Sequence, residues 1–271
     1  MLPTPSTAHA DLNRIYEPSE DSYLLLDTLS SPSETAFLTH RFSQNSTAAP
    51  NPTPVVLEVG TGSGVVLAFA TANAKTIFGR DDILAIGTDV NRFACQATRQ
   101  TVLGASQGHN DNSALASKNG GNTILLAMLN ADLTNPMRLG MVDVLIFNPP
   151  YVPSSDVPEA TFSDAKSTAG SFGHDSHLLA LSYEGGVDGM EVTNRLLEQL
   201  PEVLECERGV AYILLCQQNR PEEAVKRVRD WGEGWSVEIV GRSGKVAGWE
   251  KLCIIRIWRI QEATPSLKRR M

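Results

Sequence analysis

The sequence predicts an α/β fold in which helices cover both faces of a mostly parallel sheet. Three observations predict it. Apolar strand segments alternate with helical segments, a glycine-rich turn at Gly60–Gly64 follows the first strand, and the chain closes with two strands joined by a short loop. The continuous apolar runs are typical of parallel strands buried on both faces, and the closing hairpin adds one antiparallel strand.

The N-terminal half is expected to contain four strands. Residues 54–60 are an apolar, β-branched run that ends in glycine, which is typical of a buried strand, and 65–74 are expected to form the helix that follows it. Three further apolar segments, 83–90, 123–133 and 141–151, continue the series. Alternation of this kind predicts parallel pairing of the strands.

The C-terminal half is expected to continue with two helices and three strands. Residues 189–205 have helical periodicity, 209–219 form an apolar strand, and 221–231 form a helix with proline in its first turn. The last two strands, 236–244 and 250–260, are separated by a short loop that contains glycine. Two adjacent strands with such a loop are most simply a hairpin.

Composition excludes several classes of protein. Of the 271 residues 42% are hydrophobic and 20% charged, which supports a sizeable core, and the net charge of −8 argues against a protein that binds chiefly nucleic-acid phosphates. The four cysteines contain no Cys-x-x-Cys pair, so neither a zinc ribbon nor a disulfide framework is expected. The sequence has no signal-peptide pattern and no membrane-spanning run, so a cytoplasmic or nuclear location is expected.

A single domain is expected to occupy residues 14–260. Proline, serine and small polar residues mark the segments outside its core. These are a disordered N-terminus at 1–13, flexible insertions at about 43–54 and 104–122, a partly mobile stretch within 153–177, and a basic tail at 261–271.

The turn Gly60–Gly64 predicts a ligand site. Its glycines permit positive φ and close approach of a ligand, and the helix that follows offers free N–H donors. Val65 stands where a dinucleotide-binding turn has glycine, and no basic residue lies in the turn. Glu58, Asp89 and Asp132 are expected to converge on one crevice at the carboxyl ends of their strands. An acidic crevice favours a cofactor with a ribose, an adenine and a positive charge, and helix capping by the three carboxylates is the alternative.

The segment Asn148–Tyr151, Asn-Pro-Pro-Tyr, predicts an acceptor site beside that crevice. Both residues before a proline are restricted to extended shapes, so the Asn148 side-chain oxygen and the Pro149 carbonyl can act as a paired acceptor. Tyr151 adds a flat face. Such a site suits a planar –NH₂ group, whose nitrogen it would hold in line with an electrophilic methyl. A proline-terminated strand with an aromatic plug is the alternative.

Together these segments resemble the HemK-type class I S-adenosylmethionine-dependent methyltransferases. The opening segment is most similar to the release-factor glutamine methyltransferases of the Mtq2 type, and the similarity runs from about Tyr16 to Arg259. One departure is Ser182-Tyr183-Glu184, where the family often has Trp before the paired glycines. The matching segments are Tyr16–Asp27, Leu57–Gly64, Asp89, Asn148–Tyr151, Gly185-Gly186, Gly189–Val192 and Gly248–Leu252.

The resemblance implies a seven-stranded Rossmann-like sheet, a lid-like N-terminal helix at about 18–29, and methylation of the glutamine N5 amide in the Gly-Gly-Gln motif of release factor eRF1. The implied cofactor is S-adenosylmethionine, with S-adenosylhomocysteine as product. The implied cofactor contacts are Ser22, Glu58, Gly60, Asp89, Asp132, Leu133 and Asn148. Asn148, Pro149 and Tyr151 would be catalytic, and Asn148, Pro149, Pro150 and Tyr151 would bind substrate.

The resemblance also implies a heterodimer with the small zinc-binding activator Trm112, and a substrate eRF1 that acts with or without eRF3-GTP. A partner is independently expected because the third strand is apolar on both faces and would be a bare sheet edge. A local helix or the 104–122 loop is the alternative cover. The residues expected to meet the partner are Ile124, Leu125, Leu126 and Met128. His174 and His177 have no further ligands near them in sequence, so no metal is expected in this chain.

Four other functions fit the same residues less well. An N6-adenine methyltransferase would use the same acceptor site, the Asn148–Tyr151 cradle, on a flipped-out base. A protein-lysine methyltransferase would need the lysine ammonium to lose a proton first. A catalytically silent scaffold would not need the full set of proposed contacts. An NAD oxidoreductase is disfavoured by Val65 and the missing pyrophosphate clamp.

Overall fold

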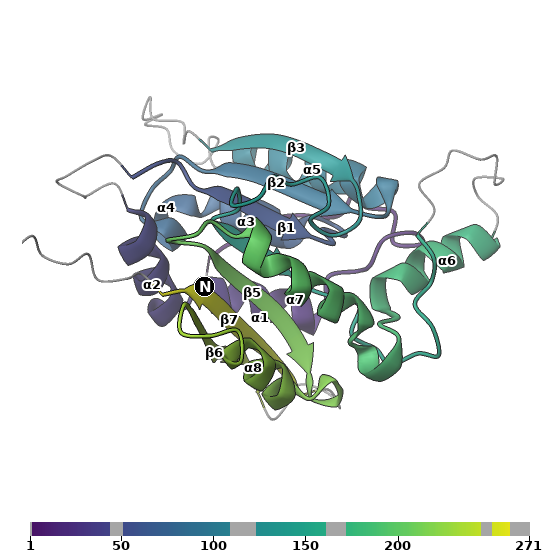
Figure 1. Ribbon diagram of the computed structural model, residues 1–271. Coiled ribbons are helices and arrows are strands. Elements are labelled where there is room, and N and C mark those ends of the chain that lie inside the picture. Colours follow the sequence, from purple (N-terminus) through teal and green to yellow (C-terminus); the bar gives the residue numbers. More distant parts are fainter. Residues whose placement is uncertain (1, 44–50, 109–122, 161–171, 245–250, 261–271) are drawn as a thin grey trace, which may run out of the picture.

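The computed structural model describes residues 2–43, 51–108, 123–160, 172–244 and 251–260. The strands form one seven-stranded sheet in the order β3-β2-β1-β4-β5-β7-β6 (Figure 1). Only β7 runs antiparallel to its neighbours, so the predicted fold class is confirmed. The strands are β1 Val55–Val59, β2 Leu84–Asp89, β3 Ile124–Asn130, β4 Val144–Phe147, β5 Val210–Cys216, β6 Trp235–Arg242 and β7 Leu252–Arg259.

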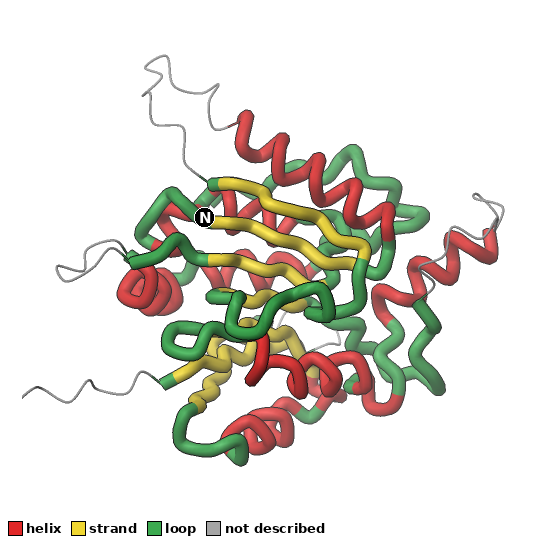
Figure 2. Tube along the Cα trace, turned by 45° about the horizontal axis from the view of Figure 1, so that its top comes forward, coloured by secondary structure: helices red, strands yellow, loops and turns green. Residues whose placement is uncertain are grey.

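Helices cover both faces of the sheet and bury two apolar cores. Alternate strand residues enter opposite cores: Val56 packs with helices α1 to α5, and its neighbour Leu57 packs with α7 and α8. Helix α6 lies beyond the carboxyl ends of the strands (Figures 1 and 2). The helices are α1 Glu20–Leu29, α2 Pro32–Phe42, α3 Val65–Ala72, α4 Ala74–Phe78, α5 Arg92–Gly108, α6 Phe172–Tyr183, α7 Glu191–Val203 and α8 Pro221–Arg229. None of these helices has the length and hydropathy needed to cross a bilayer.

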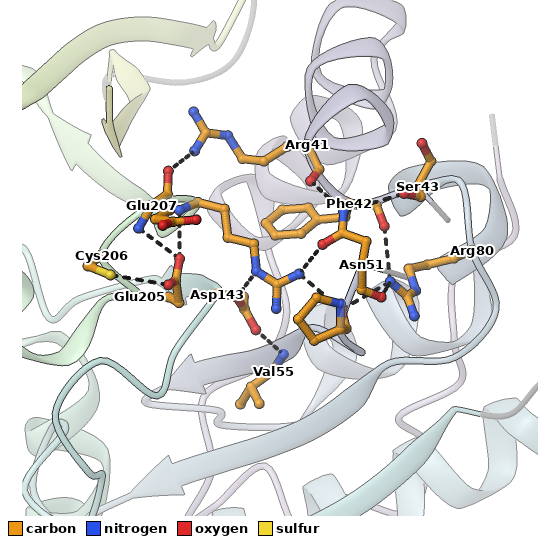
Figure 3. Close-up of polar contacts among 12 residues, drawn as sticks. Arg41, Phe42, Ser43, Asn51, Val55, Arg80, Asp143, Glu205, Cys206 and Glu207 are labelled. Atoms are coloured by element: carbon orange, nitrogen blue, oxygen red, sulfur yellow. Dashed lines mark hydrogen bonds and ion pairs between the residues drawn. The ribbon is translucent and has the colours of Figure 1, made fainter. Parts of the chain in front are cut away.

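An arginine cluster closes the amino edge of the sheet (Figure 3). The Arg208 Nε lies 2.7 Å from Asp143 Oδ1, and its guanidinium donates to Asn51 Oδ1 at 2.6 Å. Arg80 donates to the carbonyl oxygen of Asn51 at 3.1 Å, and Asp143 Oδ2 accepts from the Val55 amide at 2.7 Å. Charge-assisted contacts of this kind are stronger than neutral ones. They fix the segment before β1, and the ligand cavity lies at the opposite edge.

The structure differs from the sequence-based expectations in two segments. Residues 2–13, expected to be disordered, lie against α5: His9 Nε2 is 3.0 Å from the Ala97 carbonyl oxygen and 3.2 Å from Thr101 Oγ1. The insertion expected from 104 begins later, because α5 continues to Gly108. Of the stretch 153–177, expected to be mobile in part, residues 172–177 belong to α6 and 161–171 lie outside the described part of the chain. Residues 44–50, 109–122 and 261–271 lie outside the described part of the chain.

Candidate active site

A cavity of about 400 Å³ lies at the carboxyl ends of the central strands. Its floor comes from the segments that follow β1, β2, β3 and β4, and α1, α6 and residues 157–160 contribute to its walls. The sheet order β2-β1-β4 reverses at β1, which is the place where open α/β sheets bind ligands. The volume is in the range of small-molecule sites. Glu58, Asp89 and Asp132 all line this cavity, so their expected convergence is confirmed.

The glycine turn connects β1 to α3 and forms part of the cavity floor. Gly60 has φ of 64°, and its amide donates to the Thr88 carbonyl at 2.8 Å. Gly64 has φ of 79°, and a Cβ there would lie 2.5 Å from the Thr98 Cα, so only glycine lets α3 approach α5 this closely. A Cβ on Gly62 would meet nothing within 4 Å. The turn therefore has one packed side and one open side.

Glu58, near the end of β1, is a buried carboxylate that caps α3. Its Oε2 accepts from the Leu67 amide at 2.9 Å, which is the third amide of the helix. Burial raises the pKa of Glu58 well above its usual value, the hydrogen bond from Leu67 opposes the rise, and the nearby Asp89 charge adds to it. A cation bound in the cavity would favour the ionised form.

Asp89, at the end of β2, clamps the glycine turn to the start of α5. Its Oδ2 accepts from the Gly62 amide at 2.9 Å, and its Oδ1 accepts from the Asn91 amide at 2.7 Å. Burial raises the pKa of Asp89 to about 6, and these two hydrogen bonds oppose the rise. Each carboxylate oxygen can accept more than one hydrogen bond. Glu58 and Asp89 thus accept hydrogen bonds from backbone amides, as the helix-capping alternative expected. Their carboxylate oxygens can still accept further hydrogen bonds from a ligand.

Asp132 and Leu133 follow β3, which ends three residues earlier than expected, at Asn130. Asp132 pairs with Arg195 of α7, and both residues line the cavity. Sequence reasoning did not identify Arg195, which is 63 residues away, and the cavity rim is therefore not purely acidic. Leu133 is 5% exposed, has a φ of 49°, and also lines the cavity.

Asn148 lies between the cofactor-sized cavity and a second one of about 520 Å³. It follows the end of β4 and lines both cavities. Its side-chain oxygen Oδ1 is buried and has no hydrogen-bond partner in the described part of the protein. Pro149 and Tyr151 line the second cavity and Pro150 the first. An unsatisfied buried acceptor is rare in proteins, and at the junction of two cavities a bound ligand can supply its donor.

Helix α1 ties the two cavities together. Ser22 is buried and lines the first cavity, as expected for a cofactor contact, and the adjacent Asp21 lines the second. Asp21 Oδ2 accepts from the Tyr16 hydroxyl at 2.9 Å and from the Tyr151 hydroxyl at 3.4 Å. Burial, followed by the charge of Asp21, raises the pKa of Tyr16 to about 12. The N-terminal helix is thus bonded directly to the Asn-Pro-Pro-Tyr segment.

The remaining family-like segments surround the same region. Gly185 and Gly189 lie against the Asn-Pro-Pro-Tyr backbone, because a Cβ on Gly185 would be within 3.0 Å of the Pro150 carbonyl oxygen and one on Gly189 within 3.0 Å of that of Tyr151. Residues 248–250 of the closing segment are outside the described chain. Over the described residues, no three His, Cys, Asp or Glu side chains are grouped to hold a metal ion. His177 Nε2 lies 3.0 Å from the Glu159 carbonyl oxygen.

Relatives of known name match nearly the whole chain, although no family model does. The chain is 30% identical over 265 residues to the eRF1 methyltransferase catalytic subunit mtq2 of Schizosaccharomyces pombe, covering 96% of this chain and 97% of that protein. It is 30% identical over 261 residues to the methyltransferase HEMK2 of Mus musculus, covering 94% and 96%. Among solved structures, the E. cuniculi Mtq2-Trm112 complex, which methylates the termination factor eRF1, contains a chain of the same fold, with a TM-score of 0.52 and 22% identity over 91% of this chain and 99% of that one.

Proposed function

Since this chain belongs to the Mtq2–HEMK2 family of methyltransferases, we propose that it methylates the side-chain amide of the glutamine in the Gly-Gly-Gln motif of release factor eRF1, with S-adenosylmethionine as methyl donor. The observation that carries the proposal is the buried, unpartnered Oδ1 of Asn148 at the junction of two cavities. One cavity has the features of a donor site and the other those of an acceptor site.

The first cavity fits S-adenosylmethionine in size and in the chemistry of its walls. Asp89 offers carboxylate lone pairs to ribose hydroxyls, and Leu133 offers an apolar surface to the adenine. The open side of Gly62 leaves room for close approach of the cofactor. Glu58 is a buried part of the lining, and a positively charged group bound there would favour its ionised form. When bound, the cofactor supplies an electrophilic methyl carbon, and the residues of this chain hold and orient the nitrogen that attacks it.

The acceptor cradle suits an amide because an amide nitrogen is a poor nucleophile that needs alignment. Asn148 Oδ1 and the Pro149 carbonyl can accept the two N–H groups, which fixes the amide plane so that the nitrogen lone pair, perpendicular to that plane, points toward the donor cavity. The nitrogen gives up one of its two protons to water when it is methylated. As positive charge develops on the nitrogen, the same fixed oxygens stabilise it. Glutamate offers no N–H donor, so the cradle also discriminates, by as much as about 10⁴-fold.

The second cavity disfavours a nucleic-acid substrate. Glu20 and Asp21 of α1 stand at its wall, next to Asn148. Negative charge in the lining of an acceptor site repels the phosphates that flank a flipped-out base. An adenine amine could therefore be accepted by the cradle, but the negative charge of the cavity lining disfavours the nucleic acid that carries it.

A Trm112-like partner is proposed to cover strand β3. The strand is an edge of the sheet, and Ile124 and Leu126 are 52% and 49% exposed. Leu125 and Met128 pack against the core from the same strand. An apolar edge strand promotes association with another chain, and strand addition would cover it.

The experiment is mass spectrometry of eRF1 after incubation with this chain, a Trm112-like partner and S-adenosylmethionine. We expect one added methyl group on the glutamine of the Gly-Gly-Gln motif. An eRF1 variant with glutamate at that position is the matched control, and it should stay unmodified. Methylation of a lysine instead, or of an adenine in added RNA with eRF1 unmodified, would contradict the proposal.

A further inference from the structure

We propose that Asn219 is a positioning residue for the methyl transfer, because it holds the backbone of the acceptor cradle in place from a distant part of the chain. The inference rests on the proposed function for its effect on turnover. Asn219 lines neither of the two cavities described above, and it acts through the peptide group of Tyr151.

Asn219 lies in the short turn that connects β5 to α8, and its side chain is buried, with 2% exposure. Its Oδ1 accepts from the Cys216 amide at 2.8 Å, which anchors the side chain to the end of β5. Arg220, with φ of 50°, and Pro221 then redirect the chain into α8. The side chain is thereby fixed on a rigid strand of the sheet.

The amide nitrogen of Asn219 connects two separate segments. Its Nδ2 donates to the Tyr151 carbonyl at 2.9 Å and to the Asp188 carbonyl at 2.9 Å, with Gly189 at 3.3 Å as a third, weaker acceptor. Tyr151 belongs to the cradle, and Asp188 and Gly189 belong to the turn that follows α6. One side chain thus joins β5, the cradle and this turn.

The turn depends on this support because its backbone is strained. Asp188 has φ of 55°, which a residue with a Cβ rarely adopts, and Gly189 has φ of 66°. The chain between α6 and this turn is bonded to Val152, the residue after the cradle: the Val152 amide donates to the Tyr183 carbonyl at 2.9 Å, and the Gly185 amide donates to the Val152 carbonyl at 2.8 Å. Loss of Asn219 would free carbonyls on both sides and let the cradle backbone move.

Asparagine is the side chain that these contacts require. It presents an acceptor to one backbone amide and two N–H donors to carbonyl oxygens. Aspartate would keep the acceptor but place an oxygen against the carbonyls of Tyr151 and Asp188, so it would fit only when protonated. Protonated aspartate has a single O–H donor, so the Asn219→Asp variant should regain part of its activity, relative to wild type at the same pH and at saturating cofactor, as the pH is lowered.

The test uses the full chain with its partner and compares Asn219→Ala and Asn219→Asp with Asn73→Ala. Asn73 is a matched control: it is 4% exposed, donates from Nδ2 to the Phe69 carbonyl at 2.9 Å, and lies at the end of α3 remote from the glycine turn. For each variant we would measure kcat, the KM for eRF1, the Kd for S-adenosylmethionine and amide hydrogen exchange.

For Asn219→Ala we expect a fall in kcat of about 100-fold, the size associated with a misplacement of about 1 Å. The cofactor Kd should stay within about twofold, since Asn219 does not touch that cavity, and a twofold change is only about 0.4 kcal/mol. The Val152 and Gly185 amides should exchange faster while the amides of β1 stay protected. Asn73→Ala should change none of the catalytic values.

Unchanged exchange at Val152 and Gly185 in Asn219→Ala would overturn the inference, as would faster exchange with unchanged kcat. Equal losses of kcat in Asn219→Ala and Asn73→Ala would also overturn it, because the loss would then follow from removing any buried asparagine and not from the contact with Tyr151. If wild-type enzyme leaves eRF1 unmodified, the proposed function fails, whereas the exchange comparison still decides whether Asn219 holds the cradle.

Discussion

Replacement of Asn148 by alanine should remove activity without destabilising the protein. In the free protein Oδ1 has no partner, so truncation breaks no hydrogen bond at that atom. A buried acceptor without a donor costs about 1–3 kcal/mol, so its removal can even raise the stability. In the transition state the same oxygen faces developing positive charge, and loss of one such contact costs about 2.7–4 kcal/mol, or about 10²–10³-fold in kcat.

The assay combines single-turnover methylation of eRF1 with calorimetric measurements of cofactor binding and thermal unfolding. For a chain of this size, a change of 1 kcal/mol in the free energy of unfolding shifts Tm by about 2–4 °C. The Tm of Asn148→Ala should therefore either rise or fall by less than this amount. The exposed Asn13, replaced by alanine, is the control for asparagine truncation as such. Full activity in Asn148→Ala would refute the cradle, and a large drop in Tm would show that the residue is mainly structural.

Three further predictions concern the cofactor cavity, the glycine turn and the sheet edge. Burial raises the pKa of Asp89 to about 6 and also raises that of Glu58, and a bound cation favours both carboxylates. Affinity for S-adenosylmethionine should therefore fall as the pH is lowered through about 6, by up to about tenfold per pH unit for each carboxyl group that must ionise. Calorimetry with Asp89→Asn should give a shallower profile, and tighter binding by wild type at lower pH would contradict this. Gly64→Ala should lower the free energy of unfolding by about 2–5 kcal/mol, because of its positive φ and the overlap of the new Cβ with Thr98, whereas Gly62→Ala should lower it by only about 1–2 kcal/mol. Equal urea midpoints for the two variants would show that the close approach of α3 to α5 at Gly64 is unimportant. Leu126→Lys should leave the fold intact and abolish binding of a Trm112-like partner in size-exclusion chromatography, whereas undiminished binding would place the partner elsewhere.

Local sequence patterns were sufficient for the sheet and for most of the site. A buried strand followed by a glycine turn places Glu58 and Gly60 at the carboxyl edge, and strand alternation brings Asp89 and Asn148 to the same edge. The α5 helix was not predicted, although Ala94, Ala97 and Val102 lie on one buried face at helical spacing. Its first turns contain mainly polar and small residues, which weakened that signal.

The residues that were missed act through contacts between distant segments. Arg195 pairs with Asp132 from a helix 63 residues later, and Asn219 reaches Tyr151 across 68 residues. Neither residue belongs to a recognisable motif. The position of a single Arg or Asn in a sequence does not indicate which distant residue it will contact. The path of the N-terminal residues over α5 is of the same kind, since His9 contacts Ala97 and Thr101, about 90 residues later in the chain.

The most direct test of the account is a structure of the complex with S-adenosylhomocysteine and a Gly-Gly-Gln peptide of eRF1. The account predicts that the glutamine nitrogen lies about 3 Å from Asn148 Oδ1 and from the Pro149 carbonyl, with the sulfur of the product on the opposite side of that nitrogen. A glutamine bound elsewhere, or an Asn148 side chain turned away from it, would contradict the central claim.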